Sequence, residues 1–572
     1  EPREGASRAS RAQQVLISLD ALSLLTGQLV VSSVDIGGVE LAAPQGDGFN
    51  LTDLAGFRVD GTDALIEQLF AVLNSVAIKV DTIQARAFRF SDIEISGAGV
   101  PVVIDNAMVS RVDGKHYEVL ADIERAGRKI TLKGTAEARP NEAELSRLTG
   151  SVSGLAIDFL TDGLSDRQNG VTAPLEISFT SNRGSQTRKP ALSVKVAASD
   201  GTMTMGGVEA NLGDTRINLV YMPRMHKMEI SSSIIRVGET VVPFTGGLID
   251  ADRLENIDGK GIAFDFVVDK GLAAPGDSDE PPITFGAKAF GWFDAAERKL
   301  VAEELTVASS QGAMFGSASW RFVEGISPEI NLVAESPQMS TAAVKQLWPY
   351  WMGKKARQWV LENLYGGTVT NARIQLAAPA GHYRPDGETP FNDDQLQIDF
   401  DIARTRMNVS GDIPPLRDTV GHMRLRGSAV SFNIQSATAF FPTGRTVDVN
   451  DAKFSIAATN EKPLMADLSM SVHGNADAVA ELITYHPIDA LDRIGLEPSE
   501  LSGDISAVVA ARFGLIQDQS PPPPDWTVNL DMTGVDIAKP IEGRMLTKMD
   551  GNLSVTPERA ELKADALVDG AR

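Results

Sequence analysis

Alternation of apolar and polar residues with a period of two constrains the fold of this chain more than any other sequence feature. In one segment Leu192, Val194 and Val196 alternate with Ser193 and Lys195. The same pattern places further apolar side chains on one face at Ile262, Phe264, Phe266 and Val268, at Trp320 and Phe322, at Ile398, Phe400 and Ile402, and at Leu468, Met470 and Val472. Such alternation is typical of antiparallel sheets that are wet on one face. Continuous apolar strands separated by long helices, typical of parallel βαβ units, are not found. We therefore predict a mainly β fold of antiparallel β-meanders.

The segment 340–376 is the clearest exception to the alternation. Ser340 is a plausible N-cap for a short helix that ends at Leu347, and Pro349 interrupts the helical pattern. A second helix is predicted from Gly353 to Leu364, followed by a strand. Its apolar stripe consists of Ala356, Trp359, Val360 and Leu364, and its C-terminal stop is formed by Gly366 and Gly367. The simpler interpretation is a helical cap over the end of a β core. The alternative is a gate or an interfacial membrane contact.

The succession of strands, short helical cap, glycine and strands recurs later in the chain, which indicates a degenerate internal repeat whose units stack on one another. Shorter helical patterns occupy 15–25 and 63–73, and Asp113-Gly114 predicts a hairpin. Two polar segments that contain prolines, at 271–282 and 518–525, are predicted to be boundaries between structural units. The predicted organisation is a polar lead and the start of an amphipathic segment at 1–20, β repeats at 21–335, a helical cap at 336–366, a β repeat at 367–517 with a second cap at 476–494, a proline-rich spacer at 518–525, and a further β unit at 526–572.

Length, charge and composition narrow the class of protein. A chain of 572 residues is too long for one compact core. Its net charge of −23 argues against nucleic acid as a partner. The chain contains no cysteine, which excludes disulfides and thiolate chemistry and fits an oxidising compartment. The sequence has no run of about 18 apolar residues and no apolar signal-peptide core. Its last residues, KADALVDGAR, stop within an apparent meander, so we expect the chain to be a fragment and any membrane anchor to lie outside it.

A search for chemical motifs nominates no catalytic residue and no metal site. The six histidines are far apart in the sequence, and no nucleophile elbow, dinucleotide loop or phosphate-binding loop has the required spacing. The acidic tracts 277–280, 392–394 and 448–451 lack the spacing of a calcium loop, so we interpret them as solvated loops.

Residues 347–376, LWPYWMGKKARQWVLENLYGGTVTNARIQL, resemble the signature of the AsmA-like superfamily, YhdP-type branch. The shared features are a W-P-x-W segment, a Lys/Arg-Ala-Arg-x-W helix and a Gly-Gly strand start. Residues 19–41 and 526–537 resemble the lead and a later β unit of the same superfamily. The resemblance implies an elongated repeat of β-meanders curled into a U-shaped apolar groove. It further implies a protein of the Gram-negative periplasm, anchored to the inner membrane by a segment absent from this chain.

The function implied by the resemblance is the conduction of phospholipids between the inner and outer membranes, in support of outer-membrane integrity, without catalysis or cofactor. Other envelope proteins are possible partners, and nucleic acid is not. The predicted groove lining is Phe264, Phe266, Val268, Trp320, Phe322, Ile398, Phe400, Leu468, Met470 and Val472. The predicted cap, with a patch for phosphate headgroups, consists of Trp348, Trp351, Trp359, Lys354, Lys355 and Arg357.

Three alternatives remain open on the sequence alone. Apolar faces with a period of two also build closed β-sandwiches, whose interiors are ordinary cores. A scaffold that captures outer-membrane proteins by strand addition at exposed sheet edges is the alternative function. For Lys354, Lys355 and Arg357, the alternative to a headgroup patch is a solvated helix face.

Overall fold

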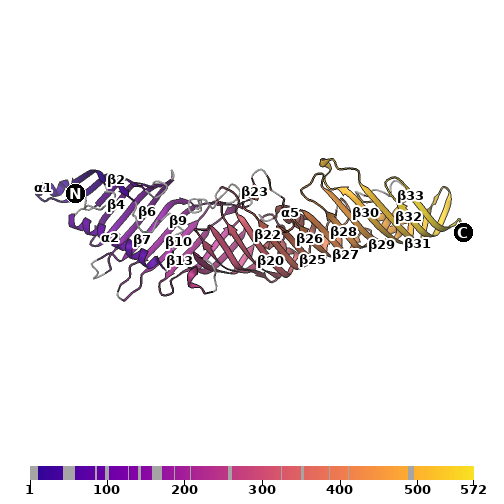
Figure 1. Cartoon of the computed structure of the whole chain (residues 1–572), viewed down its shortest axis with the longest axis horizontal. Coiled ribbons are helices and arrows are strands. Elements are labelled where there is room, and N and C mark those ends of the chain that lie inside the picture. Colours follow the sequence, from indigo (N-terminus) through magenta and orange to yellow (C-terminus); the bar gives the residue numbers. More distant parts are fainter. Residues whose placement is uncertain are drawn as a thin grey trace. The chain divides into compact units, whose positions relative to one another are not determined.

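The fold was analysed in a computed structural model of the chain (Figure 1), which describes residues 11–42, 58–83, 87–96, 102–125, 128–139, 144–156, 170–185, 187–205, 208–255, 260–323, 325–349, 353–384, 387–388, 390–409, 411–486, 488 and 495–571. The fold is mainly β, with 63% of residues in strands and 11% in helices, and the sheet is antiparallel, with one parallel strand pair among the described residues. This confirms the predicted class of antiparallel meanders with short helices. The chain divides into two compact units. Unit 1 comprises Glu1–Leu272, Phe285–Leu305 and Ser319–Pro328, and unit 2 comprises Ala273–Thr284, Thr306–Ala318 and Glu329–Arg572.

Unit 1 is a meander in which most strands pair with the next strand in the chain. Its helices are α1 (Ala21–Leu25) and α2 (Thr62–Ile83). Its strands are β1 (Arg11–Leu19), β2 (Val31–Ala42), β3 (Ala87–Ser96), β4 (Val102–Asp113), β5 (His116–Arg125), β6 (Arg128–Glu137), β7 (Arg147–Ala156), β8 (Gly170–Thr172), β9 (Pro174–Asn182), β10 (Ala191–Ala198), β11 (Gly201–Met205), β12 (Val208–Leu212), β13 (Thr215–Met222), β14 (Lys227–Val237), β15 (Thr240–Asp250) and β16 (Ile262–Ala273). The strands β17 (Ile283–Asp294), β18 (Lys299–Ser309) and β19 (Gly312–Arg321) each contain residues of both units.

One part of unit 1 differs from the prediction. β2 and β3 pair in parallel, and α2 connects them, so a βαβ crossover is present although the sequence pattern argues against such units. α2 spans Thr62–Ile83, whereas the helical pattern predicts only 63–73. α2 continues beyond the predicted end because Ala77, one turn further along, is also buried in the core of unit 1. The segment 15–25 also differs, since it forms the end of β1 and the exposed helix α1.

Unit 2 is a second meander, and its described part has helical interruptions at α4–α5 and at α6. Its helices are α4 (Thr341–Leu347), α5 (Lys354–Asn363) and α6 (Ala476–Leu482). Its strands are β20 (Glu329–Ser340), β21 (Leu364–Tyr365), β22 (Thr368–Ala378), β23 (Tyr383–Arg384), β24 (Gly387–Glu388), β25 (Leu396–Met407), β26 (Leu416–Arg426), β27 (Ala429–Phe440), β28 (Thr446–Ile456), β29 (Met465–Asn475), β30 (Leu501–Gly514), β31 (Asp525–Ile541), β32 (Arg544–Val555) and β33 (Ala560–Val568). From β25 to β33 each strand pairs antiparallel with the next.

The predicted helices of unit 2 form, with small differences at their ends. The Ser340 hydroxyl accepts a hydrogen bond from the Ala343 amide at 3.0 Å, which confirms the N-cap. α5 ends at Asn363, and the left-handed Gly366 and Gly367 lie in the turn between β21 and β22 rather than directly after the helix. In the second predicted cap, 476–494, the structure has α6 over its first seven residues, and Pro487 and 489–494 lie outside the described residues.

The proline-rich segment 518–525 is a connection between two paired strands. Arg512 of β30 is the register partner of Asp525 of β31, and the pairing continues along both strands. The Leu464 amide donates to the Gln519 side chain at 2.7 Å, which ties the connection to the start of β29. The segment therefore lies within unit 2 and does not separate two units, contrary to the predicted spacer.

Candidate functional site: apolar sheet faces and helical covers

A lateral row of apolar side chains crosses seven neighbouring strands of unit 2. In the strand register, each member is the direct partner of the next, from β25 to β31. We call this the aromatic row: Phe400, Met423, Phe432, Phe454, Leu468, Ala511 and Trp526. All members except Phe432 are only partly buried. At about 4.8 Å per strand the row extends roughly 30 Å across the sheet. The apolar surface is therefore continuous between strands and partly accessible to solvent.

A second row includes Val472 and crosses β27 to β33, of which β27 to β31 also carry the aromatic row. We call this the aliphatic row: Ala437, Val449, Val472, Ala507, Leu530, Leu553 and Leu562. Its members on β27 to β30 are buried, those on β31 and β32 are partly buried, and Leu562 on β33 is 54% exposed. Burial therefore falls along the row away from the strands that contact α6.

The opposite face of the same strands is polar and charged. Asp399 accepts hydrogen bonds from Arg424 and Arg426, and His422 Nδ1 lies 2.8 Å from Asp401 Oδ1. Burial alone would raise the pKa of Asp399, but the two arginines outweigh this effect and the pKa is lowered. A carboxylate that stays ionised beside guanidinium groups is typical of a hydrated surface. The two faces of the sheet thus differ in chemistry, as the alternation predicts.

Unit 1 has an apolar face of the same kind. A row of direct register partners crosses β5, β6, β7, β9, β10 and β13, and every member is partly buried. We call this the branched row: Ala121, Leu132, Val152, Ile177, Val196 and Ile217. On β16 the Phe264 and Phe266 rings are stacked with centroids 5.0 Å apart, and Phe244 of β15 meets Phe266 edge-on. The side chains predicted to share a face therefore do so.

Helices cover one end of each apolar face. In unit 1, Ile66 and Phe70 of α2 pack with Tyr117, Leu148 and Tyr221 of the sheet. In unit 2, Val360 of α5 and Val479 of α6 join a core that includes members of the aliphatic row. The Trp359 ring of α5 lies 5.3 Å from the Phe432 ring, and Trp359 is still 37% exposed. Phe432 is the one buried member of the aromatic row, so the edge of this cover lies over that row.

Two buried cations hold α4 and α5 in place. Arg357 of α5, 1% exposed, donates two hydrogen bonds to the Asp277 carboxylate at 2.6 and 2.7 Å. It also donates to the Lys345 and Trp348 carbonyl oxygens at 2.7 and 2.8 Å. Lys345 of α4, 2% exposed, donates to Glu280 and to the Leu361 carbonyl oxygen, each at 3.1 Å. The loop before β17 thus neutralises both cations.

α6 is fixed by the reverse arrangement, in which the helix supplies the carboxylates. Arg445, from the β27–β28 hairpin, donates to Asp477 at 2.6 Å and to the buried Glu481 at 2.8 Å. These two hydrogen bonds raise the pKa of Arg445, with Glu481 contributing most. Thr443 of the same hairpin also donates to Glu481. Each helical cover of unit 2 is therefore tied to a loop by ion pairs in which at least one side chain is buried or mostly buried.

A third ionic cluster lies at the start of α2. The buried Asp250 carboxylate accepts from the Val59 and Asp60 amides at 2.8 Å each, just before the helix. Arg58 pairs with Asp60 and with Asp252 at 3.0 Å, and its hydrogen bonds lower the pKa of Asp60 to about 2. Burial has the opposite effect on Asp250 and raises its pKa. The cluster fixes the N-terminal end of α2 against β15 and the turn that follows.

The structure distributes the predicted lining residues between the two units. Phe264, Phe266, Val268, Trp320 and Phe322 belong to unit 1, and all five are partly buried. Ile398, Phe400, Leu468, Met470 and Val472 belong to unit 2, where Val472 is buried and the others are partly buried. Phe400 and Leu468 lie in one row, which the sequence does not reveal because register is set by tertiary pairing.

The predicted headgroup patch on the cap does not form as a unit. Lys354 and Lys355 are exposed at the start of α5, but Arg357 points into the protein and is neutralised by Asp277. Trp348 is partly buried against the core of unit 2, and Trp351 lies outside the described residues. Arg357 is therefore a structural residue of the cover, and the interpretation of the three cations as one surface group is wrong for this residue.

The carboxylates that pair with Lys345 and Arg357 were not predicted from the sequence. Asp277 and Glu280 lie in the acidic tract 277–280, which was interpreted as a solvated loop, yet both are ion-pair partners of buried side chains. The signal available in the sequence was the pair of cations Lys345 and Arg357 on two helices predicted to cap the end of a β core. Only the fold shows that a loop 65 to 80 residues away supplies the opposite charge.

Among the described residues, no group of three or more His, Asp or Glu side chains is placed to hold a metal ion. None of the described helices combines the length and the apolar character that a membrane span requires. Comparison of the chain with known protein families, with curated proteins and with solved structures finds no match in any of the three. The candidate site therefore stands on the geometry of the apolar faces alone.

Proposed function

We propose that this protein binds phospholipids along its apolar sheet faces and conducts them between membranes. The observation that supports the proposal is the continuity of the apolar rows from strand to strand, combined with their partial exposure. A closed core would bury such side chains, whereas the members of the branched row and most members of the aromatic row keep some contact with solvent. A face of this kind fits acyl chains, which need an apolar surface but no specific polar contact.

The energetics of lipid transfer favour such a surface. Each acyl methylene exposed to water costs about 0.8 kcal/mol, so two chains of about 16 carbons cost roughly 25 kcal/mol. A protein that lowers this cost must offer an apolar face along the whole path, because any polar gap restores part of the barrier. Rows that run perpendicular to the strands provide continuity in the direction in which a meander grows.

In this proposal the helical covers limit access to the apolar faces. α5 lies at the edge of the aromatic row through Trp359, and α6 lies over the buried part of the aliphatic row. Lipid would contact the partly exposed members beyond the covers. The resemblance of residues 347–376 to the AsmA-like superfamily agrees with this role. It adds the expectation of a periplasmic location, an inner-membrane anchor outside this chain and a non-enzymatic function.

The test is lipid loading of variants that place a charge on the apolar face. We expect Phe266→Glu and Met470→Glu each to reduce the phospholipid that co-purifies with the protein, because a carboxylate beside acyl chains is costly to desolvate. Native mass spectrometry and extraction of bound lipid provide the measurement. The matched controls are Thr245→Glu and Ser469→Glu, which place the same charge on the opposite face of the same or a neighbouring strand.

Normal loading of both apolar-face variants, with melting temperatures like those of the controls, would contradict the proposal. That outcome would favour the alternative of a non-enzymatic scaffold for the assembly of outer-membrane proteins. One observation suits this alternative. β1 pairs only with β2 within the described residues, and its side chains Val15, Leu16 and Ile17 are more than half exposed. Such an edge is open to strand addition.

A further inference from the structure

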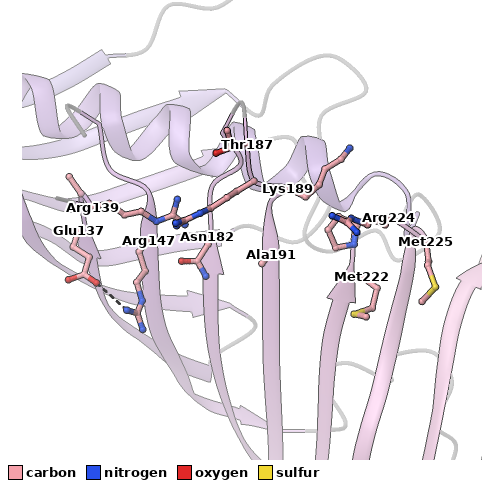
Figure 2. A pocket seen from close by; sticks show the side chains of 13 residues that line it. Glu137, Arg139, Arg147, Asn182, Thr187, Lys189, Ala191, Met222, Arg224 and Met225 are labelled. Atoms are coloured by element: carbon pink, nitrogen blue, oxygen red, sulfur yellow. Dashed lines mark ion pairs between the residues drawn. The ribbon is translucent and has the colours of Figure 1, made fainter. Parts of the chain in front are cut away.

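A basic pocket lies on unit 1 (Figure 2). Glu137 and Arg147 each lie five positions from the branched-row residue of their strand, so the pocket is on the face of the sheet opposite that row. Its floor is a row of strand-end positions that are register neighbours on β6, β7, β9 and β10, followed by the end of β13. Two hairpin loops, 187–189 and 223–225, complete it. We define the basic pocket by its charged residues, Glu137, Arg139, Arg147, Arg188, Lys189 and Arg224. It encloses about 1180 Å³ and is open to solvent.

The charge of the pocket contrasts with that of the chain. Five cationic side chains and one carboxylate line it, whereas the whole chain carries a net charge of −23. Glu137 pairs with Arg147 at 3.5 Å, so it does not neutralise Arg188, Lys189 or Arg224. Arg188, Lys189 and Arg224 are exposed, and within the described part of the chain they have no ion-pair partner. Unpaired cations held together on an acidic protein repel one another, so an anionic ligand would relieve that repulsion.

The surroundings of the pocket do not supply that anion. Arg188 and Lys189 also border a smaller hollow with Asp63 and Glu67 of α2. Glu67, however, accepts hydrogen bonds from the Arg183 guanidinium at 2.9 Å and from the Gly184 amide at 3.1 Å. The neighbouring Glu144 is also bound by Arg183. Glu67 and Glu144 are therefore engaged by a different arginine, and Asp63 forms no ion pair with Arg188 or Lys189 among the described residues.

The pocket is separate from the proposed lipid face. Ala136, Leu148 and Tyr221, one residue before or after the floor positions Glu137, Arg147 and Met222, point to the other side and pack against α2. A lipid whose chains lie on the apolar face is thus divided from the pocket by both the sheet and the helix. The inference that follows does not depend on the proposed lipid transfer.

We propose that the basic pocket binds phosphoryl groups displayed side by side. Four of its five cations are arginines, whose planar guanidinium groups match phosphate oxygens with two parallel hydrogen bonds. The floor crosses five strands, or roughly 20 Å at about 4.8 Å per strand, which is wider than a single phosphate. The shared chemistry is that of several adjacent phosphates. They are present on a surface of anionic phospholipid headgroups and in a soluble polyphosphate.

At physiological salt the pocket can act in spite of the net charge of the protein. The Debye length is then about 8 Å, so most of the distant carboxylates are screened while the pocket cations remain in contact with the ligand. The strand ends and short loops hold these cations at the rim of the sheet, where a surface can approach them.

The test measures binding in 0.15 M NaCl to vesicles of phosphatidylcholine with and without about 30% phosphatidylglycerol, and to soluble tripolyphosphate. The pocket variant carries Arg188→Gln, Lys189→Gln and Arg224→Gln. The control variant carries Lys133→Gln, Lys195→Gln and Arg216→Gln, three exposed cations on the same sheet with the same change in net charge. We expect wild type and control to bind the phosphatidylglycerol vesicles, and the pocket variant to bind at least about tenfold more weakly.

Each outcome decides the proposal. Loss of vesicle binding in the pocket variant alone supports a headgroup surface as the ligand, and binding of tripolyphosphate but not vesicles supports a soluble source of phosphates. Equal losses in both variants, no binding of either probe by wild type, or equal binding of a polyglutamate peptide would overturn it. Matching melting temperatures exclude misfolding of the variants. Unchanged lipid loading of the pocket variant separates this result from the test of the apolar faces.

Discussion

At the scale of single residues, buried charge decides where the helices of unit 2 lie. Arg357 is almost fully buried and is satisfied by one carboxylate and two carbonyl oxygens. Burying a guanidinium without such partners would cost several kcal/mol. A lysine at this position could not reproduce the two parallel bonds to Asp277. The arginine therefore specifies one packing of α4 and α5 against the loop before β17.

Asp277→Ala should destabilise unit 2 because it leaves the Arg357 charge buried without its counterion. Removing a partner from a buried pair costs about 3–5 kcal/mol, and because the Asp277 side chain is 42% exposed we expect about 2 kcal/mol. Urea unfolding followed by tryptophan fluorescence measures the effect. Asp279→Ala, an exposed change in the same loop, should shift stability by less than about 0.5 kcal/mol. Equal effects of the two changes would show that Asp277 does not hold the helix.

At the scale of elements, a tight turn at Gly366 and Gly367 connects the strand that follows the α5 cover to the next strand of the sheet. Gly367 has φ +67°, and a Cβ there would lie 2.5 Å from the Ala403 and Arg404 carbonyl oxygens of β25. Gly366 has φ +61° with open space around its Cβ position. The adjacent glycines share a left-handed backbone but differ in their surroundings. Only Gly367 is required by the close approach of β22 to β25, directly after the α5 cover.

The difference between the two glycines can be measured. Gly366→Ala should cost about 1 kcal/mol, the penalty of a left-handed alanine. Gly367→Ala carries the same penalty and also displaces β25, so its cost should exceed that of Gly366→Ala by about 2 kcal/mol. Thermal and urea unfolding of the two variants provide the comparison. Equal stabilities would mean that the β22–β25 approach relaxes freely.

At the scale of the whole molecule, each unit carries its own apolar face and its own helical cover. The branched row belongs to unit 1, and the aromatic and aliphatic rows belong to unit 2. The covers also differ in their ionic ties, with carboxylates from loops in one case and from the helix in another. Both units thus combine an apolar sheet face with a helical cover that is held by ion pairs, but different residues form these contacts.

If both units bind lipid, the number of lipids per chain should fall in steps. Phe266→Glu should remove the share bound by unit 1, Met470→Glu the share bound by unit 2, and the double variant most of both. Changes in separate units with no shared contacts are expected to add. Counting lipids per chain by native mass spectrometry checks this. Complete loss in one single variant would show that the two faces do not load independently.

The sequence by itself determined the class of fold and the chemistry of the two faces. A period of two requires neighbouring side chains of a strand to point to opposite sides, so Val194 and Val196, Phe264 and Phe266, and Phe400 and Ile402 had to share faces. The N-cap Ser340 and the hairpin at Asp113-Gly114 follow from local chemistry in the same way. These features depend on residues close together in the chain.

Tertiary structure alone decided what lies side by side. Register set the order of the aromatic row, because a shift of one residue would reverse the faces of a strand. Folding also brought Asp277 to Arg357, turned 518–525 into a connection within unit 2, and gathered Arg147, Arg188 and Arg224 from separate strands and loops into one pocket. These outcomes depend on contacts between segments far apart in the chain. The local sequence pattern does not show which of these segments become neighbours.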